Sequence, residues 1–102
     1  MTNKPIDFTN LDFEYKKTNG NIRYYFSNQK WDSGTIHTDE SFPIHIAATC
    51  LHYGQSCFEG LKVFQTKNGD IVAFRPDENY KRFVRSAQKL FMTPPTKEIF
   101  FD

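Results

Sequence analysis

The chain has 102 residues and a formal net charge of +1, because 13 Lys and Arg face 12 Asp and Glu. This balance argues against a dedicated nucleic-acid binder, which carries a basic excess on one face. Aromatic residues make up 17% of the chain, and a disordered protein is poor in them. No apolar run approaches the ~18 residues of a membrane span, and the start lacks a secretory signal. With only two cysteines, the composition indicates one small domain in a reducing, cytoplasmic setting.

The first part of the chain predicts a polar extension followed by two strands. Residues 1–20 are polar with scattered aromatics, and we interpret them as an N-terminal extension to a domain over 21–102. Residues 22–26 (IRYYF) are rich in β-branched and aromatic residues, which is typical of a strand. A polar break follows, and a second short strand is predicted over 35–38.

The middle of the chain, residues 44–60, is neither cleanly helical nor cleanly alternating. Its mixture of small residues, His, Cys and Gly predicts a tight helical turn over 47–52 and a loop that opens at Gly54. Irregular loops on a rigid scaffold are where function concentrates. We therefore expect functional residues in this segment.

A hairpin and a helix are the firmest local predictions. Residues 61–65 and 71–74 read as two strands, and Asn68-Gly69 between them is a strong turn signal. A helix is predicted over 77–91, with Pro and Asp at its start and Pro94-Pro95 after its end. Its apolar positions recur at helical spacing: Tyr80, Phe83, Val84, Ala87, Leu90 and Phe91.

The fold class that these elements predict is α+β. We expect one antiparallel sheet, with the helix over 77–91 packed on one of its faces. The sheet is built from four strands: 22–26, 35–38, 61–65 and 71–74. Thr96 is a candidate N-cap for a further helix. Because the apolar pattern is interrupted at Asp102, we expect the chain to be the front part of something longer.

Four side chains invite a metal interpretation: His45, Cys50, His52 and Cys57. Their spacing, H-x4-C-x-H-x4-C, matches no usual zinc arrangement of close pairs, so no metal site is predicted. A Cys–His nucleophile pair is conceivable, but nothing supplies the orienting third group. Free cysteines and hydrogen-bonded histidines are the simpler interpretation.

Two charged residues are candidates for chemistry. Arg82 lies at the border of the apolar stripe, where its planar fork suits a phosphate or a carboxylate. The ordinary alternative is a surface pair with Glu78, four residues earlier on the helix. Glu59 lies in the aromatic loop beside Gly60 and is a general base or a structural acceptor. Without a partner acid in view, the structural role is favoured.

Several motifs together resemble the branched-chain amino acid aminotransferases, which are fold-type IV enzymes dependent on pyridoxal 5′-phosphate. The resemblance is carried by Leu51-His52-Tyr53-Gly54, Phe58-Glu59-Gly60-Leu61-Lys62, Phe74-Arg75-Pro76 and Asn79-x-x-Arg82. It implies the small N-terminal domain of the D-amino acid aminotransferase-like fold, incomplete at its C-terminus.

The resemblance also implies roles for single residues. Arg82 matches the arginine that binds the cofactor phosphate. Tyr53 matches the tyrosine that reaches across the dimer into the neighbour's substrate pocket, so we expect it to be exposed in an isolated chain. Phe58 matches an aromatic wall of that pocket, Gly60 a glycine of close approach, and Phe13 a further pocket aromatic near the start.

The implied activity is amino transfer between Leu, Ile or Val and 2-oxoglutarate in a homodimeric enzyme. The family's catalytic lysine lies in a second domain that these 102 residues lack. The chain alone is therefore expected to be inactive, and no catalytic residue is assigned within it. Two alternatives stay open. One is a stand-alone, non-catalytic α+β module that binds an anion at Arg82. The other is a relative of the D-amino acid aminotransferases or aminodeoxychorismate lyases.

Overall fold

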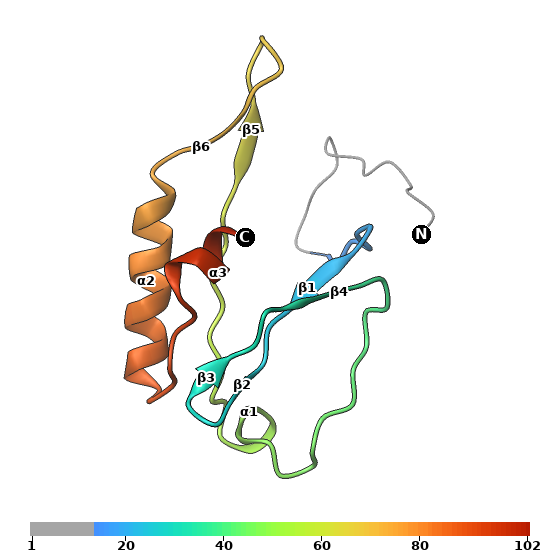
Figure 1. The fold of residues 1–102 in the computed structure, drawn as a ribbon, viewed down its shortest axis with the longest axis vertical. Coiled ribbons are helices and arrows are strands. Elements are labelled where there is room, and N and C mark those ends of the chain that lie inside the picture. The colour runs from blue at the N-terminus through green and yellow to red at the C-terminus, as the bar shows by residue number, and fades with distance from the viewer. Residues whose placement is uncertain (1–13) are drawn as a thin grey trace. The chain divides into compact units, whose positions relative to one another are not determined.

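The computed structural model describes residues 14–102, so the predicted pocket residue Phe13 lies outside the described residues. The chain divides into two compact units, residues 1–44 and 45–102, and each is treated by itself. Short antiparallel strand pairs and three helices make up the described part, which confirms the α+β class (Figure 1). None of the helices within residues 14–102 has the length and apolarity to cross a membrane.

The described part of the first unit, residues 14–44, contains two short antiparallel pairs. Strand β1 (Asn21–Arg23) pairs with β4 (Thr35–His37), so that Asn21 lies opposite His37. Strand β2 (Phe26–Ser27) pairs with β3 (Lys30–Trp31). This second pairing was not predicted from the sequence, where the residues between Ser27 and Lys30 read only as a polar break.

The turn between β2 and β3 explains the missed hairpin. Asn28 and Gln29 have φ values of 52° and 69°, and positive φ at both central positions is the signature of a type I′ turn. Asn is common in such turns, whereas Gln is not, so the dipeptide carries a weak sequence signal. The rings of Phe26 and Trp31 then meet across the pair with centroids 5.2 Å apart.

The predicted strand over 22–26 is interrupted at Tyr24 and Tyr25. Asp32 causes the break, because its Oδ1 accepts hydrogen bonds from the backbone N–H of Tyr25 and of Gly34, each at 3.0 Å. Gly34 has φ +82°, and a Cβ atom there would lie 2.5 Å from Cε1 of Tyr24. The Tyr24 ring therefore packs directly over a position that requires glycine.

The second unit contains the predicted hairpin. Strand β5 (Val63–Gln65) pairs with β6 (Ile71–Ala73), and both strands are shorter than predicted. Gly69 in the turn has φ +87°, a backbone conformation that residues other than glycine rarely adopt. The turn closes through backbone hydrogen bonds from Thr66 N–H to Asp70 O at 2.8 Å and from Gly69 N–H to Thr66 O at 3.0 Å.

The prediction of a single four-stranded sheet is wrong for residues 14–102, where the strands form three separate two-stranded sheets. Each of these strands has only two or three residues. The partners β2 and β3, and likewise β5 and β6, are consecutive in sequence, whereas β1 and β4 enclose the β2–β3 pair. Composition and alternation mark a segment as a strand, but they do not specify its partner. The predicted pairing of 61–65 with 71–74 is therefore confirmed, the predicted strand over 22–26 is divided between β1 and β2, and the error lies in joining the pairs into one sheet.

Helix α2 (Pro76–Lys89) confirms the predicted helix, with Pro76, Asp77 and Glu78 in its first turn. Its C-terminus corrects the predicted apolar stripe. Phe91 lies outside the helix with φ +57° and is 95% exposed. The Phe91 and Met92 N–H groups bond back to the carbonyls of Gln88 and Ala87, at 3.1 and 2.9 Å. These two bonds form a Schellman closure, which turns Phe91 away from the helix face.

Helix α3 (Lys97–Phe101) begins as predicted at Thr96, whose Oγ1 accepts from the Ile99 N–H at 3.3 Å. It packs on the apolar side of α2 through the Phe100 ring, which lies 5.3 Å from the ring of Tyr80 and 5.8 Å from that of Phe83. The Tyr80 hydroxyl donates to Pro95 O at 2.9 Å. Among the described hydrophobic side chains, Ala87 of α2 is the buried one, 2% exposed.

Candidate functional site

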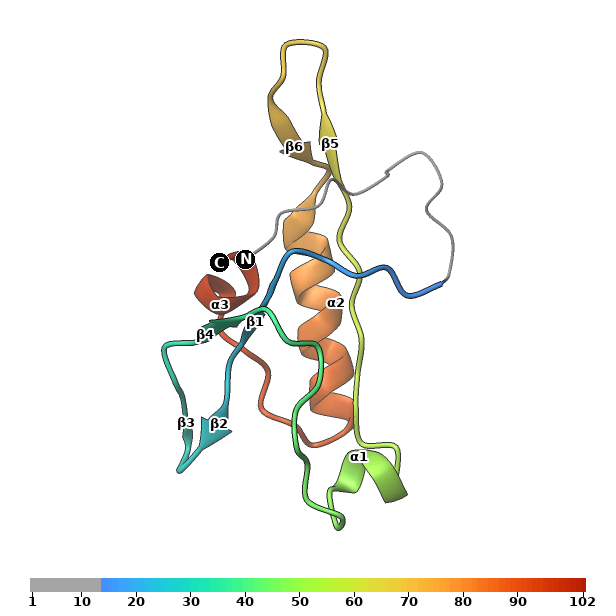
Figure 2. The ribbon, with the colours of Figure 1, turned by 90° about the vertical axis from the view of Figure 1, so that its right-hand side faces the viewer.

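The segment 55–60 lies along helix α2 and carries two of the predicted site residues, Phe58 and Gly60. Gln55 Nε2 donates to Leu90 O at 2.7 Å at one end, and Asn79 Nδ2 donates to Gly60 O at 2.8 Å at the other. Figure 2 shows this extended yellow-green stretch running beside α2. The short helix α1 (Thr49–His52) precedes it, and Thr49 Oγ1 contacts Gln55 Oε1 at 2.5 Å.

Burial alternates along the 55–60 segment as it does along a strand. Its odd-numbered residues, Gln55, Cys57 and Glu59, are half-buried, and its even-numbered residues, Ser56, Phe58 and Gly60, are exposed. Successive side chains of an extended chain point to opposite faces. Glu59 therefore points toward α2, while Phe58 points away from it.

Arg82 of α2 and Glu59, near the end of this segment, form a bidentate ion pair. Arg82 Nε lies 2.7 Å from Glu59 Oε1, and Arg82 Nη2 lies 2.5 Å from Glu59 Oε2. The Glu59 side chain is only 5% exposed, whereas that of Arg82 is 61% exposed. The hydrogen bonds from Arg82 hold the pKa of the Glu59 carboxyl below its ordinary value, and the same bonds raise the pKa of Arg82.

The pairing corrects the alternative in which Arg82 pairs with Glu78. Glu78 lies instead 3.2 Å from Lys81 Nζ and 3.8 Å from Arg75 Nη2. The pair between Arg82 and Glu59 also identifies Glu59 as a structural acceptor, the role that the sequence favoured. Sequence reasoning missed that Arg82 is the donor, since the two residues are 23 positions apart and no periodic pattern joins them.

The unused face of Arg82 fits an anion. A guanidinium carries five N–H donors, and the pair with Glu59 engages one on Nε and one on Nη2. The remaining donors belong to a side chain that is 61% exposed. These donors are open to an anionic group, such as a phosphate or a carboxylate, without displacement of Glu59.

Two of the predicted substrate residues, Tyr53 and Phe58, have exposed side chains. Phe58 is 90% exposed, and Tyr53, just after α1, is 85% exposed, which confirms the expected exposure of Tyr53. A Cβ atom at Gly60 would meet only the Phe58 ring, at 3.9 Å, which is ordinary contact. The described residues therefore do not themselves require glycine at this position.

A cavity of about 450 Å³ borders the same segment. It is lined by Gly60, Leu61, Lys62, Phe64, Phe74 and Asn79. Gly60 thus lies between this cavity and Phe58. The lining includes neither Arg82 nor Tyr53, so the structure does not join all the predicted site residues in one cavity.

The two His residues of the middle segment contact the local backbone. His45 Nδ1 accepts from the Ala47 N–H at 3.0 Å, and His52 Nε2 lies 2.5 Å from Ile46 O. Cys50 and Cys57 are both free thiols. Within residues 14–102, no three His, Cys, Asp or Glu side chains are grouped as a metal site would require.

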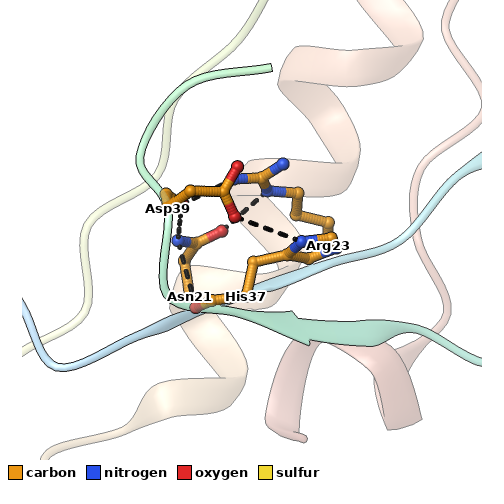
Figure 3. A network of polar contacts seen from close by, with 4 residues as sticks. All are labelled: Asn21, Arg23, His37 and Asp39. Atoms are coloured by element: carbon orange, nitrogen blue, oxygen red, sulfur yellow. Dashed lines mark hydrogen bonds and ion pairs between the residues drawn. The ribbon is translucent and has the colours of Figure 1, made fainter. Parts of the chain in front are cut away.

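A second polar network, in the first unit, was not predicted at all (Figure 3). Arg23 Nε donates to Asn21 Oδ1 at 2.8 Å, and Arg23 Nη2 donates to Asp39 O at 2.7 Å. Asn21 Nδ2 donates to Asp39 O at 2.9 Å, and His37 Nδ1 lies 3.4 Å from Asp39 Oδ1. The signal available in the sequence is that Asn21 and Arg23 share one face of a strand, but the register that places His37 opposite Asn21 is not readable.

Known proteins match this chain over nearly its whole length. The branched-chain-amino-acid aminotransferase of Haemophilus influenzae is 43% identical over 97 residues, which are 95% of this chain and 28% of that protein. The protein of the same name from Helicobacter pylori is 36% identical over 95 residues, 93% of this chain and 28% of its own length. Branched-chain-amino-acid aminotransferase 5, chloroplastic, of Arabidopsis thaliana is 35% identical over 98 residues, which are 95% of this chain and 24% of that protein.

No family model matches the chain. The chain spans about a quarter of the length of these relatives, and the matched residues include every motif that pointed to the resemblance. The relatives from two bacteria and a plant are all named as branched-chain-amino-acid aminotransferases, and each is 35–43% identical to this chain over the aligned residues. Over nearly its whole length, this chain is similar to part of the branched-chain-amino-acid aminotransferases.

Proposed function

We propose that the chain is the N-terminal part of a pyridoxal phosphate-dependent transaminase that exchanges amino groups between Leu, Ile or Val and 2-oxoglutarate. In this proposal residues 21–102 belong to the small domain of a fold-type IV enzyme, residues 1–20 extend it, and the enzyme is a cytoplasmic homodimer. The observation that carries the proposal is the 43% identity over 95% of the chain to a branched-chain-amino-acid aminotransferase.

Arg82 is the residue of this chain that we assign to the cofactor. Its exposed donors suit the phosphate group, and its attachment to Glu59 keeps them on the surface of α2. Pyridoxal phosphate, when bound, supplies an electron-withdrawing ring that stabilises negative charge at the substrate Cα. The protein's own contribution at Arg82 is to hold and orient that group.

The exposed aromatic residues are the ones we assign to substrate. Phe58 and Tyr53 present apolar ring surface that matches a branched aliphatic side chain, and they bury little of it within this chain. Gly60 leaves room for a close approach to the backbone, because a Cβ atom placed there would have the Phe58 ring, at 3.9 Å, as its nearest contact beyond the adjoining residues. The catalytic lysine of the reaction lies, in this proposal, outside these 102 residues.

The test is a transamination assay on the full-length protein. Purified protein is incubated with L-leucine and 2-oxoglutarate, and glutamate formation is followed alongside the absorbance of bound cofactor. We expect turnover with Leu, Ile and Val, and a cofactor absorbance that changes on addition of each. Turnover of D-alanine but not of L-leucine, or the absence of a bound chromophore, would overturn the proposal.

A further inference from the structure

We propose that Glu59 is a positioning residue: it holds the Arg82 guanidinium so that its unused donors face an incoming phosphate group. The inference rests on the proposed function and deepens it, because it adds a second residue to the phosphate site. Glu59 itself does not touch the cofactor in this proposal. It acts through Arg82, whose Nε and Nη2 lie 2.7 Å and 2.5 Å from its two carboxylate oxygens.

The need for a positioning residue follows from the exposure of Arg82. A free arginine side chain that is 61% exposed samples many rotamers, and a ligand that binds it must first restrict them. With Nε and Nη2 both fixed by one carboxylate, the plane of the guanidinium is set before any ligand arrives. Preorganisation of this kind raises affinity by removing part of the cost of ordering on binding.

Glu59 is suited to this task because it is itself held firmly. Its side chain is 5% exposed, and its Oε2 also accepts from the Gly60 N–H at 3.1 Å. The backbone on either side is fastened to α2 by Gln55 at Leu90 and by Asn79 at Gly60. The carboxylate is therefore a fixed point to which the mobile arginine is attached, rather than the reverse.

Two opposite effects of Glu59 on an anion have to be weighed. Its negative charge offsets that of Arg82 and repels phosphate, while its geometry orients the donors. The carboxylate contacts one edge of the guanidinium, on Nε and Nη2, and solvent screens charge at an exposed group. Orientation therefore outweighs repulsion, and removal of Glu59 is expected to weaken phosphate binding.

The experiment measures cofactor affinity in the full-length apoprotein, with pyridoxal 5′-phosphate and with pyridoxal, which lacks the phosphate. We expect Glu59→Gln to raise the Kd for pyridoxal 5′-phosphate by about two- to tenfold, the loss of one orienting hydrogen bond. The Kd for pyridoxal is expected to stay unchanged. In an Arg82→Ala background, Glu59→Gln is expected to have no further effect.

Asn79→Ala is the matched control, because it removes the neighbouring attachment at Gly60 and leaves the Arg82 pair in place. We expect it to change the Kd less than Glu59→Gln does. An equal effect of both variants, or tighter binding in Glu59→Gln, would overturn the inference and make Glu59 a structural or a competing group. If Glu59→Gln does not fold, Glu59→Asp supplies the same comparison, because the shorter side chain keeps the charge but cannot keep both contacts.

The failure of the two proposals is distinguishable. If Arg82→Ala leaves the Kd for pyridoxal 5′-phosphate unchanged, the phosphate site itself is wrong. If Arg82→Ala raises that Kd and Glu59→Gln does not, only the positioning role is wrong. The melting temperature of each apoprotein, measured in parallel, separates a loss of binding from a loss of folding.

Discussion

Two arginines in this chain, one in each unit, are bound in opposite ways. Arg23 donates to Asn21 and to the Asp39 carbonyl, lies 3.5 Å from the Asp39 carboxylate, and has a side chain only 15% exposed. Its guanidinium also lies 5.5 Å from the centroid of the Phe42 ring. Arg82 pairs with Glu59 along one edge, and its side chain is 61% exposed.

The difference separates a structural arginine from one available to a ligand. Arg23 is largely buried and donates to Asn21 of its own strand and to Asp39 just after β4, so its hydrogen bonds serve the fold. Arg82 is fixed along one edge and open along the rest. The exposure of the arginine side chain, 15% for Arg23 and 61% for Arg82, rather than the presence of an ion pair, is therefore the property that distinguishes the two.

The largest effect is expected where lysine replaces each arginine in the full-length protein. Arg82→Lys should raise the Kd for pyridoxal 5′-phosphate by about tenfold to several hundredfold, because an ammonium cannot reproduce two parallel bonds to phosphate oxygens. The melting temperature of its apoprotein should hardly change. Arg23→Lys should lower the melting temperature and leave the cofactor affinity unchanged. Titration of the apoproteins and thermal unfolding measure both, and an equal effect on cofactor affinity would remove the distinction.

Sequence reasoning predicted the local features of both regions and missed the contacts that cross them. The N-cap Thr96 and the Asn68-Gly69 turn were readable because each depends on a few neighbouring residues. The pairing of Glu59 with Arg82 was not, because it depends on how the 55–60 segment lies on α2. The resemblance to a family identified Arg82, yet it did not identify what holds Arg82 in place.

Phe91 and the strands show the same limit in the fold. Helical spacing includes Phe91, but the Schellman closure ends the helix before it, and this closure usually has glycine where Phe91 stands. The hairpin of β5 and β6 was predicted correctly, but the β2–β3 pair was missed, and the separate pairs were predicted to form one sheet. What the sequence lacks in both cases is a signal for where a local element stops and which other element it meets.

Glycine substitutions sharpen the contrast between the closed first unit and the open hairpin of the second. Gly34→Ala should lower the free energy of unfolding by about 2 kcal/mol, because φ +82° is strained for alanine and the new Cβ lies 2.5 Å from the Tyr24 ring. Gly69→Ala has the same backbone strain, at φ +87°, with nothing within 4 Å, and should cost about 1 kcal/mol. Chemical denaturation measures both, and equal losses would show that the Tyr24 ring moves aside freely.

Asn21 tests whether the Arg23 network is structural. Asn21→Ala removes the acceptor of Arg23 Nε and the donor to Asp39 O, so the free energy of unfolding should fall by about 1 kcal/mol. The Kd for pyridoxal 5′-phosphate should not change. Thermal unfolding and cofactor titration of the full-length variant measure the two quantities. A change in cofactor affinity without a loss of stability would place this network in the site and contradict its structural assignment.

The smallest effect is expected from acid, and it follows from the two carboxylates that face the arginines. Desolvation acts to raise the pKa of Asp39, but its backbone hydrogen bond and the charges of Arg23 and His37 outweigh this and lower it. The hydrogen bonds from Arg82 lower the pKa of Glu59. A carboxyl with a lowered pKa in the folded state stabilises the fold above its unfolded pKa, about 3.9 for Asp and 4.3 for Glu. That stabilisation is lost as the pH falls through the lowered value.

Between pH 6 and pH 3, the melting temperature of the apoprotein should therefore fall less in Asp39→Asn and in Glu59→Gln than in the unmodified protein. Solvent screens both pairs, so the difference should amount to only about 1–2 °C for each variant, and 1 M salt should reduce it further. Asp70, in the β5–β6 turn, pairs through its backbone, and Asp70→Asn is the matched control. A steeper fall in either variant would mean that its carboxylate destabilises the folded state, and for Glu59 it would remove the fixed point to which Arg82 is attached.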